Sequence, residues 1–342
     1  MSELPPLFND LARWYAISTV ALGLETGLIG ALLDGGGTAA EMAAAAAVDV
    51  HNAERWADAM VTGGYATLAG GRYGPNEDAI GPLRGGAMLD VRAAVELLVP
   101  IGAMLPRVAT AIRDGHGIRS EELQAAFGTT PELVNVPMYR ALLLPEWIAG
   151  HPELKASLER GIEVAEVGPG GGSALRILAG AFPASWFTGF DLDAATVAKA
   201  NAAAAVAGLE NIRFEVVDGS SLPPAGFDLV MVFDAFHHMT DPDAVLDGMR
   251  AALRPGGSVL LAEASVSGDA AADAMDPTAV LVYGSDLMYC FQESKTAGNA
   301  GMGATWPGRG LAAILAAHGF TEAGRVDSEA GYIVVRALPV PG

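Results

Sequence analysis

The stretch Glu163-Val-Ala-Glu-Val-Gly168-Pro-Gly-Gly-Gly172 decides the fold of this chain. A short apolar run ends in closely spaced glycines, and residues 173–181 then have a helical pattern. Glycines let a ligand approach the backbone, and the first turn of a helix offers free amides to polar or anionic groups. Asp191 ends the next apolar run, where a carboxylate can accept both hydrogens of a ribose diol. The pattern predicts a nucleotide site, compatible with a nicotinamide dinucleotide or a nucleoside cofactor.

Short apolar runs alternate with helical stretches through the second half of the chain. This alternation predicts a parallel sheet with helices on both faces. The expected fold class is therefore α/β, a doubly wound domain preceded by a mostly α-helical one. The predicted strands are residues 163–167, 186–190, 212–216, 229–233, 258–263 and 332–337.

Three further motifs come in order along the chain: Val216-Val-Asp218-Gly219, Phe227-Asp-Leu-Val-Met-Val-Phe-Asp234-Ala-Phe-His237-His238 and Arg254-Pro-Gly-Gly257. With the glycine-rich stretch and Asp191, this succession resembles the class I S-adenosylmethionine (SAM)-dependent methyltransferases over about residues 160–338. The resemblance implies a Rossmann-like, seven-stranded domain with SAM as cofactor. It also implies in-line methyl transfer to a small molecule, through a hydroxyl or a thioether, and the acceptor can be a carboxylate-bearing metabolite.

The resemblance also assigns cofactor-binding residues by position. It implies a cradle for the methionine end of SAM, a carboxylate at the ribose, contacts to the adenosine and a carboxylate near the methionine amino group. In that order, the residues are Glu166, Gly168, Gly170 and Gly172 at the methionine end, Asp191 at the ribose, Leu192, Asp218 and Gly219 at the adenosine, and Asp234 at the amino group.

His237 and His238 are the candidate catalytic residues. In plant-type O-methyltransferases a histidine after the fourth strand deprotonates the acceptor hydroxyl, and the resemblance puts His237 there. A neutral imidazole can take such a proton near neutral pH. A structural interpretation stays open, in which one ring merely caps the next helix. Some relatives hold iron with a second histidine in a later insertion, but no histidine lies between His238 and His318, so no metal is expected.

Candidate acceptor-binding residues come from a helical connector and from an insertion after the fifth strand. Arg140 is the only lysine or arginine in residues 120–154, so it would suit a carboxylate. Core packing is the alternative role for each candidate, and Cys290, the only cysteine, is expected to be a buried small hydrophobe. The full set is Tyr139, Arg140, Trp147, Tyr283, Tyr289, Gln292 and Trp306.

The first half of the chain predicts helices followed by a hairpin. Residues 7–33 have helical spacing, Thr38 and Glu41 form a capping box, and a helix over 52–63 precedes a hairpin at 65–74. This winged-helix pattern resembles the front of dimeric small-molecule methyltransferases. The expected domains are a dimerisation domain (1–87), a helical connector and pocket lid (88–159) with breaks at its prolines, and a SAM-binding methyltransferase domain (160–342) with an insertion at 265–308.

Charge separates the competing functions. The chain carries a net charge of -20, and residues 1–90 contain four arginines, no lysine and eleven acidic residues. A DNA-reading helix must approach phosphates, so this balance disfavours a SAM-sensing transcriptional regulator and nucleic-acid binding. An NAD-dependent oxidoreductase is the remaining alternative. Without a visible signal peptide or membrane span, we expect a cytoplasmic homodimer that acts on a small molecule.

Overall fold

The computed structural model describes residues 5–85, 91–128, 130–276, 278–296, 301–328 and 331–340. The chain divides into two compact units, and each is described here by itself. The first contains residues 1–103 and 127–137, and the second contains residues 104–126 and 138–342. The domain boundaries expected at residues 87 and 159 stay predictions.

The first unit begins with helices. Helix α1 (Pro6–Thr26) ends at Gly27, whose φ of +78° allows α2 (Leu28–Leu33) to start in a new direction. The single helix predicted for residues 7–33 is therefore wrong. The predicted capping box is confirmed: Thr38 Oγ1 accepts the Glu41 N–H at 3.3 Å, and Glu41 Oε2 accepts the Thr38 N–H at 2.8 Å, where α3 (Ala39–Ala46) begins.

The predicted small hairpin is confirmed, but four helices come before it where the sequence predicted three. Strands β1 (Ala66–Ala69) and β2 (Arg72–Pro75) pair antiparallel after α4 (Val50–Thr62). The Trp56 Nε1–H donates to the Thr19 carbonyl at 2.9 Å and ties α4 to α1. The shorter elements α5 (Glu77–Ile80), η1 (Gly81–Arg84) and α6 (Val91–Glu96) complete the mainly apolar core of this unit.

The connecting region is helical. Its elements are α7 (Leu98–Asp114), α8 (Ser120–Phe127), α9 (Thr130–Leu142), the π-helical turn η2 (Leu143–Ile148) and α10 (Pro152–Arg160). The breaks predicted at Pro106 and Pro137 are wrong, because both prolines lie inside helices. Buried side chains on α7 hold that helix together in spite of the backbone hydrogen bond that Pro106 cannot make. Among the described residues, one helical stretch, Val91–Asp114, is long and apolar enough to cross a membrane. Length and composition alone are weak evidence that it does so.

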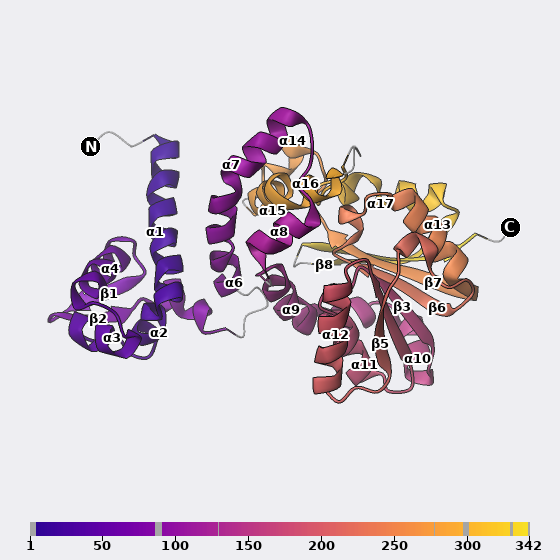
Figure 1. The fold of residues 1–342 in the computed structure, drawn as a ribbon, viewed down its shortest axis with the longest axis horizontal. Coiled ribbons are helices and arrows are strands. Elements are labelled where there is room, and N and C mark those ends of the chain that lie inside the picture. The colour runs from indigo at the N-terminus through magenta and orange to yellow at the C-terminus, as the bar shows by residue number, and fades with distance from the viewer. Residues whose placement is uncertain are drawn as a thin grey trace. The chain divides into compact units, whose positions relative to one another are not determined.

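A seven-stranded sheet forms the centre of the second unit (Figure 1). The strand order is β5-β4-β3-β6-β7-β9-β8; β3 to β7 are parallel, and β9 runs antiparallel to β7 and β8. This result confirms the predicted doubly wound α/β fold, although β8 was missed. The strands are β3 (Glu163–Val167), β4 (Trp186–Asp191), β5 (Ile212–Val216), β6 (Phe227–Phe233), β7 (Leu253–Ala264), β8 (Phe320–Ser328) and β9 (Tyr332–Pro339).

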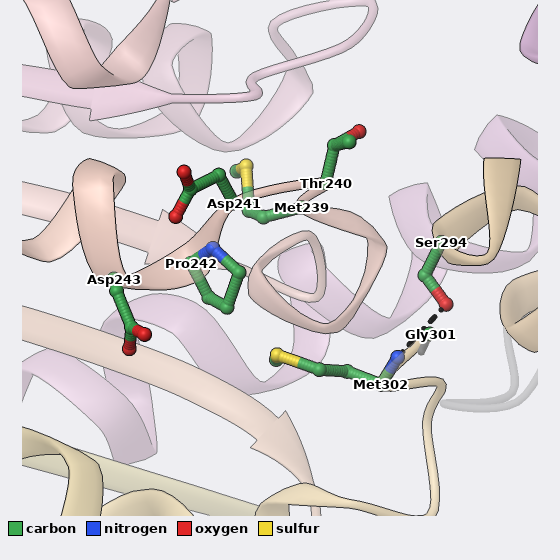
Figure 2. A pocket seen from close by; sticks show the side chains of 8 residues that line it. All are labelled: Met239, Thr240, Asp241, Pro242, Asp243, Ser294, Gly301 and Met302. Carbon is green, nitrogen blue, oxygen red and sulfur yellow. Dashed lines mark hydrogen bonds between the residues drawn. The ribbon is translucent and has the colours of Figure 1, made fainter. Parts of the chain in front are cut away.

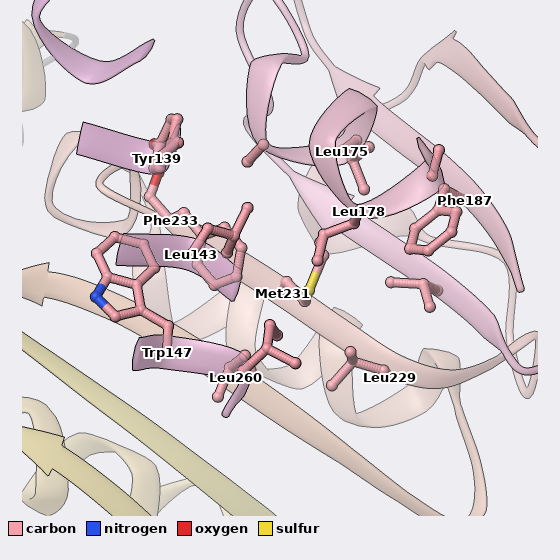
Figure 3. Close-up of a cluster of buried hydrophobic side chains, with 14 of the residues drawn as sticks. Tyr139, Leu143, Trp147, Leu175, Leu178, Phe187, Leu229, Met231, Phe233 and Leu260 are labelled. Carbon is pink, nitrogen blue, oxygen red and sulfur yellow. The ribbon is translucent and has the colours of Figure 1, made fainter. Parts of the chain in front are cut away.

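Helices cover both faces of this sheet because alternate residues of each buried strand point to opposite faces. Val164 packs into one core with α10, α11 (Ser173–Ala181) and α12 (Ala194–Val206), shown in Figure 3. Its neighbour Ala165 packs into the other core, with α13 (Pro242–Ala252) and α17 (Pro307–Ala317). The strand order reverses between β3 and β6. In open α/β sheets, ligands bind at the carboxyl ends of the strands beside such a reversal.

Short helical turns carry the residues expected to act at this edge. Turns η3 (Gly219–Ser221) and η4 (Phe236–His238) come after β5 and β6. Between β7 and α17 lie α14 (Ala270–Asp273), α15 (Ala279–Ser285), the π-helical turn η5 (Asp286–Cys290) and α16 (Phe291–Ser294). These four elements belong to the segment that the sequence predicted as an insertion.

Candidate active site

The glycine-rich loop joins β3 to α11. Gly168, Gly170 and Gly172 have φ values of +68°, +51° and +73°, in the left-handed region that favours glycine. A methyl group added at Gly172 would lie 2.3 Å from the Phe214 ring, so packing also requires glycine there. A methyl group added at Gly170 would meet nothing within 4 Å. The loop is thus packed at one end and open at Gly170, where a ligand can approach the backbone.

Asp191 ends β4 and holds the loops around it. Its Oδ2 accepts the Gly170 N–H at 3.3 Å, and its Oδ1 accepts the Asp193 N–H at 3.0 Å. Burial raises the pKa of Asp191, while these N–H groups act in the opposite direction. The next residue, Leu192, is 70% exposed. The carboxylate therefore lies beside the open glycine loop, at the carboxyl end of β4.

Glu166, on β3, is a buried carboxyl group with an unsatisfied atom. The residue is 2% exposed, and its Oε2 has no hydrogen-bond partner within the described part of the chain. Burial raises the pKa of Glu166 to about 8, and Asp191 adds to this effect. Buried polar atoms rarely stay unpaired. This orphaned oxygen therefore fits a ligand donor such as an amino group.

The loops after β5 and β6 complete this side of the site. Asp218 is exposed, and its Oδ1 accepts the Ser220 N–H at 2.8 Å. Gly219 is buried, and a methyl group there would lie 2.5 Å from Val167. Asp234 has a φ of +51°, and its N–H donates to the Ala262 carbonyl at 2.8 Å. A non-glycine residue in this conformation is uncommon, and aspartate tolerates it better than most.

His237 forms a buried pair with Glu263 from the end of β7. The His237 Nδ1 lies 2.5 Å from Glu263 Oε2, and Glu263 Oε1 accepts the Phe236 N–H at 2.8 Å. An ionised carboxylate only accepts, so it places the proton on Nδ1 and leaves Nε2 as the basic atom of a neutral ring. Burial lowers the pKa of His237, but Glu263, Asp234 and Asp286 outweigh burial and raise the pKa to about 9.

His238 has a carboxylate partner of its own. Its Nδ1 lies 2.8 Å from Glu293 Oε2, and its ring centroid lies 4.2 Å from that of His237. Burial and His237 lower the pKa of His238, while Cys290 and Glu293 raise it, with a result of about 9. Tyr289 packs edge-on against His238, with a centroid distance of 5.8 Å.

Cys290 lies in this cluster rather than apart in the core. Burial raises the pKa of its thiol, and an interaction with His238 opposes that shift. Ligand atoms of His237, His238 and Cys290 lie within 4.8 Å of one another, as do those of Asp234, His237 and Glu263. Either trio could hold a metal by distance. The absence of a metal therefore stays a prediction.

The insertion residues are fixed by internal hydrogen bonds. Gln292 is 2% exposed; its Nε2 donates to the Leu287 carbonyl at 2.9 Å, and its own main-chain carbonyl accepts the Ile118 N–H at 2.8 Å. The Tyr283 hydroxyl donates to Asp273 at 2.7 Å, and the Trp306 ring packs at 5.9 Å from the Phe236 ring. Of the four candidates here, Tyr289 is the one that packs against a candidate catalytic histidine.

The connector candidates lie in different environments. The Tyr139 hydroxyl donates to the Phe233 carbonyl at 3.3 Å, in a buried position. Trp147 is fully buried against Phe233 and Tyr332, as Figure 3 shows in part, whereas Arg140 is exposed. Burial of Trp147 favours the core-packing alternative. Acceptor binding by the connector residues stays a prediction.

Sequence reasoning missed Glu263 and Glu293. Glu263 had a recognisable signal, because it ends the predicted strand 258–263 at the edge where the parallel strands present their side chains. Glu293 had none, since its approach to His238 depends on how the insertion folds back.

Comparison with known proteins agrees with this geometry. Residues 164–257 match the family model described as a methyltransferase domain. These residues therefore form a methyltransferase domain, and SAM is its cofactor. The match covers β3 to the start of β7, which includes the glycine-rich loop, Asp191 and both histidines.

Solved structures share the fold of this methyltransferase over nearly its whole length. An O-methyltransferase from neocarzinostatin biosynthesis, solved with SAM and 2-hydroxy-5-methyl naphthoic acid, is 20% identical with a TM-score of 0.68, and the alignment covers 99% of this chain and 100% of that one. Human N-acetylserotonin methyltransferase, solved with SAM, is 19% identical with a TM-score of 0.67, and the alignment covers 100% of each chain. Mitomycin 7-O-methyltransferase is 16% identical with a TM-score of 0.70, and the alignment covers 98% of this chain and 97% of that one.

Proposed function

We propose that this methyltransferase methylates a hydroxyl group of a small molecule, with His237 as the general base and Glu263 as its positioning residue. The observation that carries the proposal is the buried contact of 2.5 Å between these two side chains. A hydroxyl acceptor must lose a proton when it is methylated, whereas a thioether has none to lose. Two of the structural neighbours are O-methyltransferases, which supports the same choice.

The residues around the glycine loop fit SAM. Gly170 leaves its backbone open, the orphaned Oε2 of Glu166 suits the methionine amino group, and Asp191 suits the ribose hydroxyls. Leu192, Asp218, Gly219 and Asp234 lie on the loops after β4, β5 and β6, at the same edge of the sheet. When bound there, SAM supplies an electrophilic methyl group.

In this proposal His237 removes the acceptor proton. Its Nε2 takes that proton, while Nδ1–H stays bonded to Glu263. The carboxylate stabilises the imidazolium that forms, and it fixes the ring because Phe236 holds its other oxygen. Burial of both side chains keeps water away from this pair. The pKa of about 9 gives a strong base whose unprotonated fraction grows with pH.

The direct test is product identification. The protein would be incubated with methyl-labelled SAM and matched pairs of phenols and thioethers, and the products analysed by mass spectrometry. Label on the phenol oxygen supports the proposal. Label on sulfur alone would instead favour the thioether acceptor, for which His237 has no proton to remove.

We also propose a homodimer built on α1. This helix exposes large apolar side chains, and contiguous apolar patches of that kind mark interaction sites. A regulator function for the first unit has less support, because its acidic residues would repel DNA phosphates. A mobility-shift assay with DNA fragments tests that alternative. The exposed apolar residues of α1 are Leu7, Phe8, Leu11, Trp14, Tyr15 and Leu22.

A further inference from the structure

A thiol and two imidazole rings meet where the insertion contacts the turn after β6. His237 and His238 lie on η4, and Cys290 is the last residue of η5. Ligand atoms of these three side chains lie within 4.8 Å of one another. A tetrahedral zinc ion holds nitrogen and sulfur ligands about 3.3–3.6 Å apart, given its bond lengths of about 2.0 Å and 2.3 Å. The three atoms therefore need to approach by at most about 1.5 Å to become zinc ligands.

A carboxylate lies against each of the two rings. The His237 Nδ1 lies 2.5 Å from Glu263 Oε2, which leaves Nε2 of that ring for another partner. The His238 Nδ1 lies 2.8 Å from Glu293 Oε2. Histidines that bind metals usually have a carboxylate at the nitrogen that does not bind the metal, because it fixes the tautomer and makes the ring a better ligand. Both rings therefore have the surroundings of metal ligands.

One nitrogen of His238 is unsatisfied. Its Nδ1 is buried and, although it lies close to Glu293, it makes no hydrogen bond with any residue that the structure describes. Buried polar atoms rarely stay unpaired. A metal on the other nitrogen can hold the ring so that Nδ1–H points at Glu293, and the unsatisfied atom then points to a missing ligand at this ring.

The other group of possible ligands is less suitable. It consists of Asp234, His237 and Glu263, whose ligand atoms also lie within 4.8 Å of one another. Both oxygens of Glu263 already have partners, because Oε2 contacts His237 and Oε1 accepts the Phe236 N–H at 2.8 Å. Glu263 therefore supports the His237 ring and is not available as a ligand.

The surroundings carry the negative charge that a divalent cation needs. Four carboxylates act on the two histidines, and a cysteine binds a metal as its thiolate. A charge taken out of water needs such partners, since its lost hydration is otherwise not compensated. The four carboxylates are Asp234, Glu263, Asp286 and Glu293.

Hydrogen bonds hold the insertion against the turn that carries the histidines. The His237 carbonyl accepts the Gly303 N–H at 3.2 Å. Ser294 Oγ accepts the Met302 N–H at 3.1 Å, the dashed line in Figure 2. Because α16, which ends at Ser294, follows η5 directly, these contacts also position Cys290. The thiol is half-buried and 24% of the His238 side chain is exposed, so an ion can reach the three residues from solvent.

We infer that His237, His238 and Cys290 form a binding site for a zinc ion, with a fourth position left for water. Two nitrogens and one thiolate suit this borderline-soft ion. The inference revises the expectation of no metal, which rested on the lack of a histidine in the insertion, because the insertion supplies a thiol instead. Zinc would occupy Nε2 of His237, so it should stop methyl transfer, and only this consequence rests on the proposed function.

Cobalt(II) gives a direct test, because Cys290 is the only cysteine in the chain. The untagged full chain would be freed of metal with a chelator and titrated with cobalt chloride while its absorbance spectrum is recorded. We expect a thiolate-to-cobalt charge-transfer band in the near ultraviolet, and zinc should remove the band because thiolate ligands favour zinc. The lack of this band, or a band that excess zinc leaves in place, would overturn the site.

Variants test which residues hold the ion. Cys290→Ser should abolish the cobalt band and weaken zinc binding, measured by calorimetry, at least about 100-fold. Glu293→Gln should keep the band and weaken zinc binding about 10- to 100-fold, as expected for a residue behind a ligand. His318→Asn is the matched control, because His318 contacts the carboxylates of Asp247 at 2.8 Å and Asp243 at 3.0 Å but no thiol. Zinc affinity that is unchanged in Cys290→Ser, or lost in His318→Asn, would overturn the site.

Turnover separates the zinc site from the proposed base. With the phenol that the product test identifies, one equivalent of zinc should suppress the wild-type rate, and a chelator should restore it. A protein that shows the cobalt band but methylates the phenol at full rate with zinc bound keeps the metal site and overturns His237 as the base. Inhibition that is equally strong in Cys290→Ser, relative to its own metal-free rate, overturns the zinc site and leaves the base standing.

Discussion

Glu263 approaches His237 from a neighbouring strand and binds both its ring and the peptide before it. Oε2 lies 2.5 Å from the imidazole Nδ1, and Oε1 accepts the Phe236 N–H at 2.8 Å. With 2% and 0% of their side chains exposed, neither partner can turn away without disturbing the core. The orientation of Nε2 is therefore determined by β7, a strand outside the glycine-rich motif.

Replacing the base should separate an oxygen acceptor from a sulfur acceptor. With a hydroxyl, His237→Ala should lower single-turnover rates about 100- to 10,000-fold and leave SAM affinity unchanged. The wild-type rate should rise with pH up to about 9, because the working ring must be unprotonated. With a thioether, His237→Ala should lower the rate about tenfold or less, and the wild-type rate should not change with pH through the titration of a histidine. A large loss with a flat pH profile would leave His237 as a structural residue.

Removing the charge of Glu263 should shift the pH range over which the rate rises. In Glu263→Gln the burial of His237 is no longer opposed by a nearby carboxylate, so its pKa should fall below about 9 and this range should shift to lower pH. The maximal rate should also fall, because the imidazolium loses its stabilising charge. Glu293→Gln makes the same change at His238 and is the control. Equal shifts in both variants would contradict a specific role for Glu263.

Asp191→Ala should weaken SAM binding by roughly 1.5–3 kcal/mol, the range for losing a hydrogen-bond partner that carries charge. Calorimetry with SAM and with NAD would measure it, and NAD should not bind. Glu215→Ala is a suitable control, because Glu215 lies on β5 and pairs with Arg213 at the surface. Unchanged SAM affinity in Asp191→Ala would remove Asp191 from the ribose role.

Glu166 should make the ligand-free protein less stable as pH rises. Its folded pKa of about 8 lies above the ordinary value of 4.5, so the folded state binds more protons between these values and loses stability towards pH 8. Glu166→Gln should raise the melting temperature at pH 8 by at least about 2–4 °C and weaken SAM binding. Glu163→Gln, at the partly exposed start of the same strand, should do neither. Equal melting curves for Glu166→Gln and wild type at pH 8 would argue against a buried ionised carboxylate.

The proposed dimer can be tested on α1. Light scattering should give about twice 35.0 kDa for the wild type at micromolar concentration. Leu11→Glu with Trp14→Glu should give a single chain, because two charges would enter the apolar interface. Val206→Glu, on an exposed residue of α12, should leave the mass unchanged. A monomeric wild type without aggregation would contradict the dimer.

The sheet was largely predictable because its strands have a strong local pattern. The apolar runs at 163–167 and 212–216 match β3 and β5 residue for residue. Strand β8 was missed because it alternates exposed and half-buried residues at the edge of the sheet, and little apolar sequence marks it. Prolines misled the prediction in the connector, since buried neighbours outweigh their cost inside α7.

The candidate site was predictable from the sequence only where its residues lie close together in one motif. Asp191 and the glycine loop lie close in the sequence, so their contact at 3.3 Å could be anticipated. The Glu293 approach to His238 joins residues far apart through the folded insertion, and no local pattern encodes it. Cys290 looked like a core residue because its type suits burial, and only the folded insertion brings it to His238.

The hydrogen bond from the Ile118 N–H to the Gln292 carbonyl has a consequence for measuring motion. It ties the turn before α8 to the segment just after Tyr289 and Cys290. The Ile118 amide proton is protected for as long as this bond holds, and Ile118 itself is fully buried. Its exchange with deuterated solvent therefore times the separation of these two segments, independently of turnover. That one amide reports how often the residues around Ile118 and Gln292 come apart.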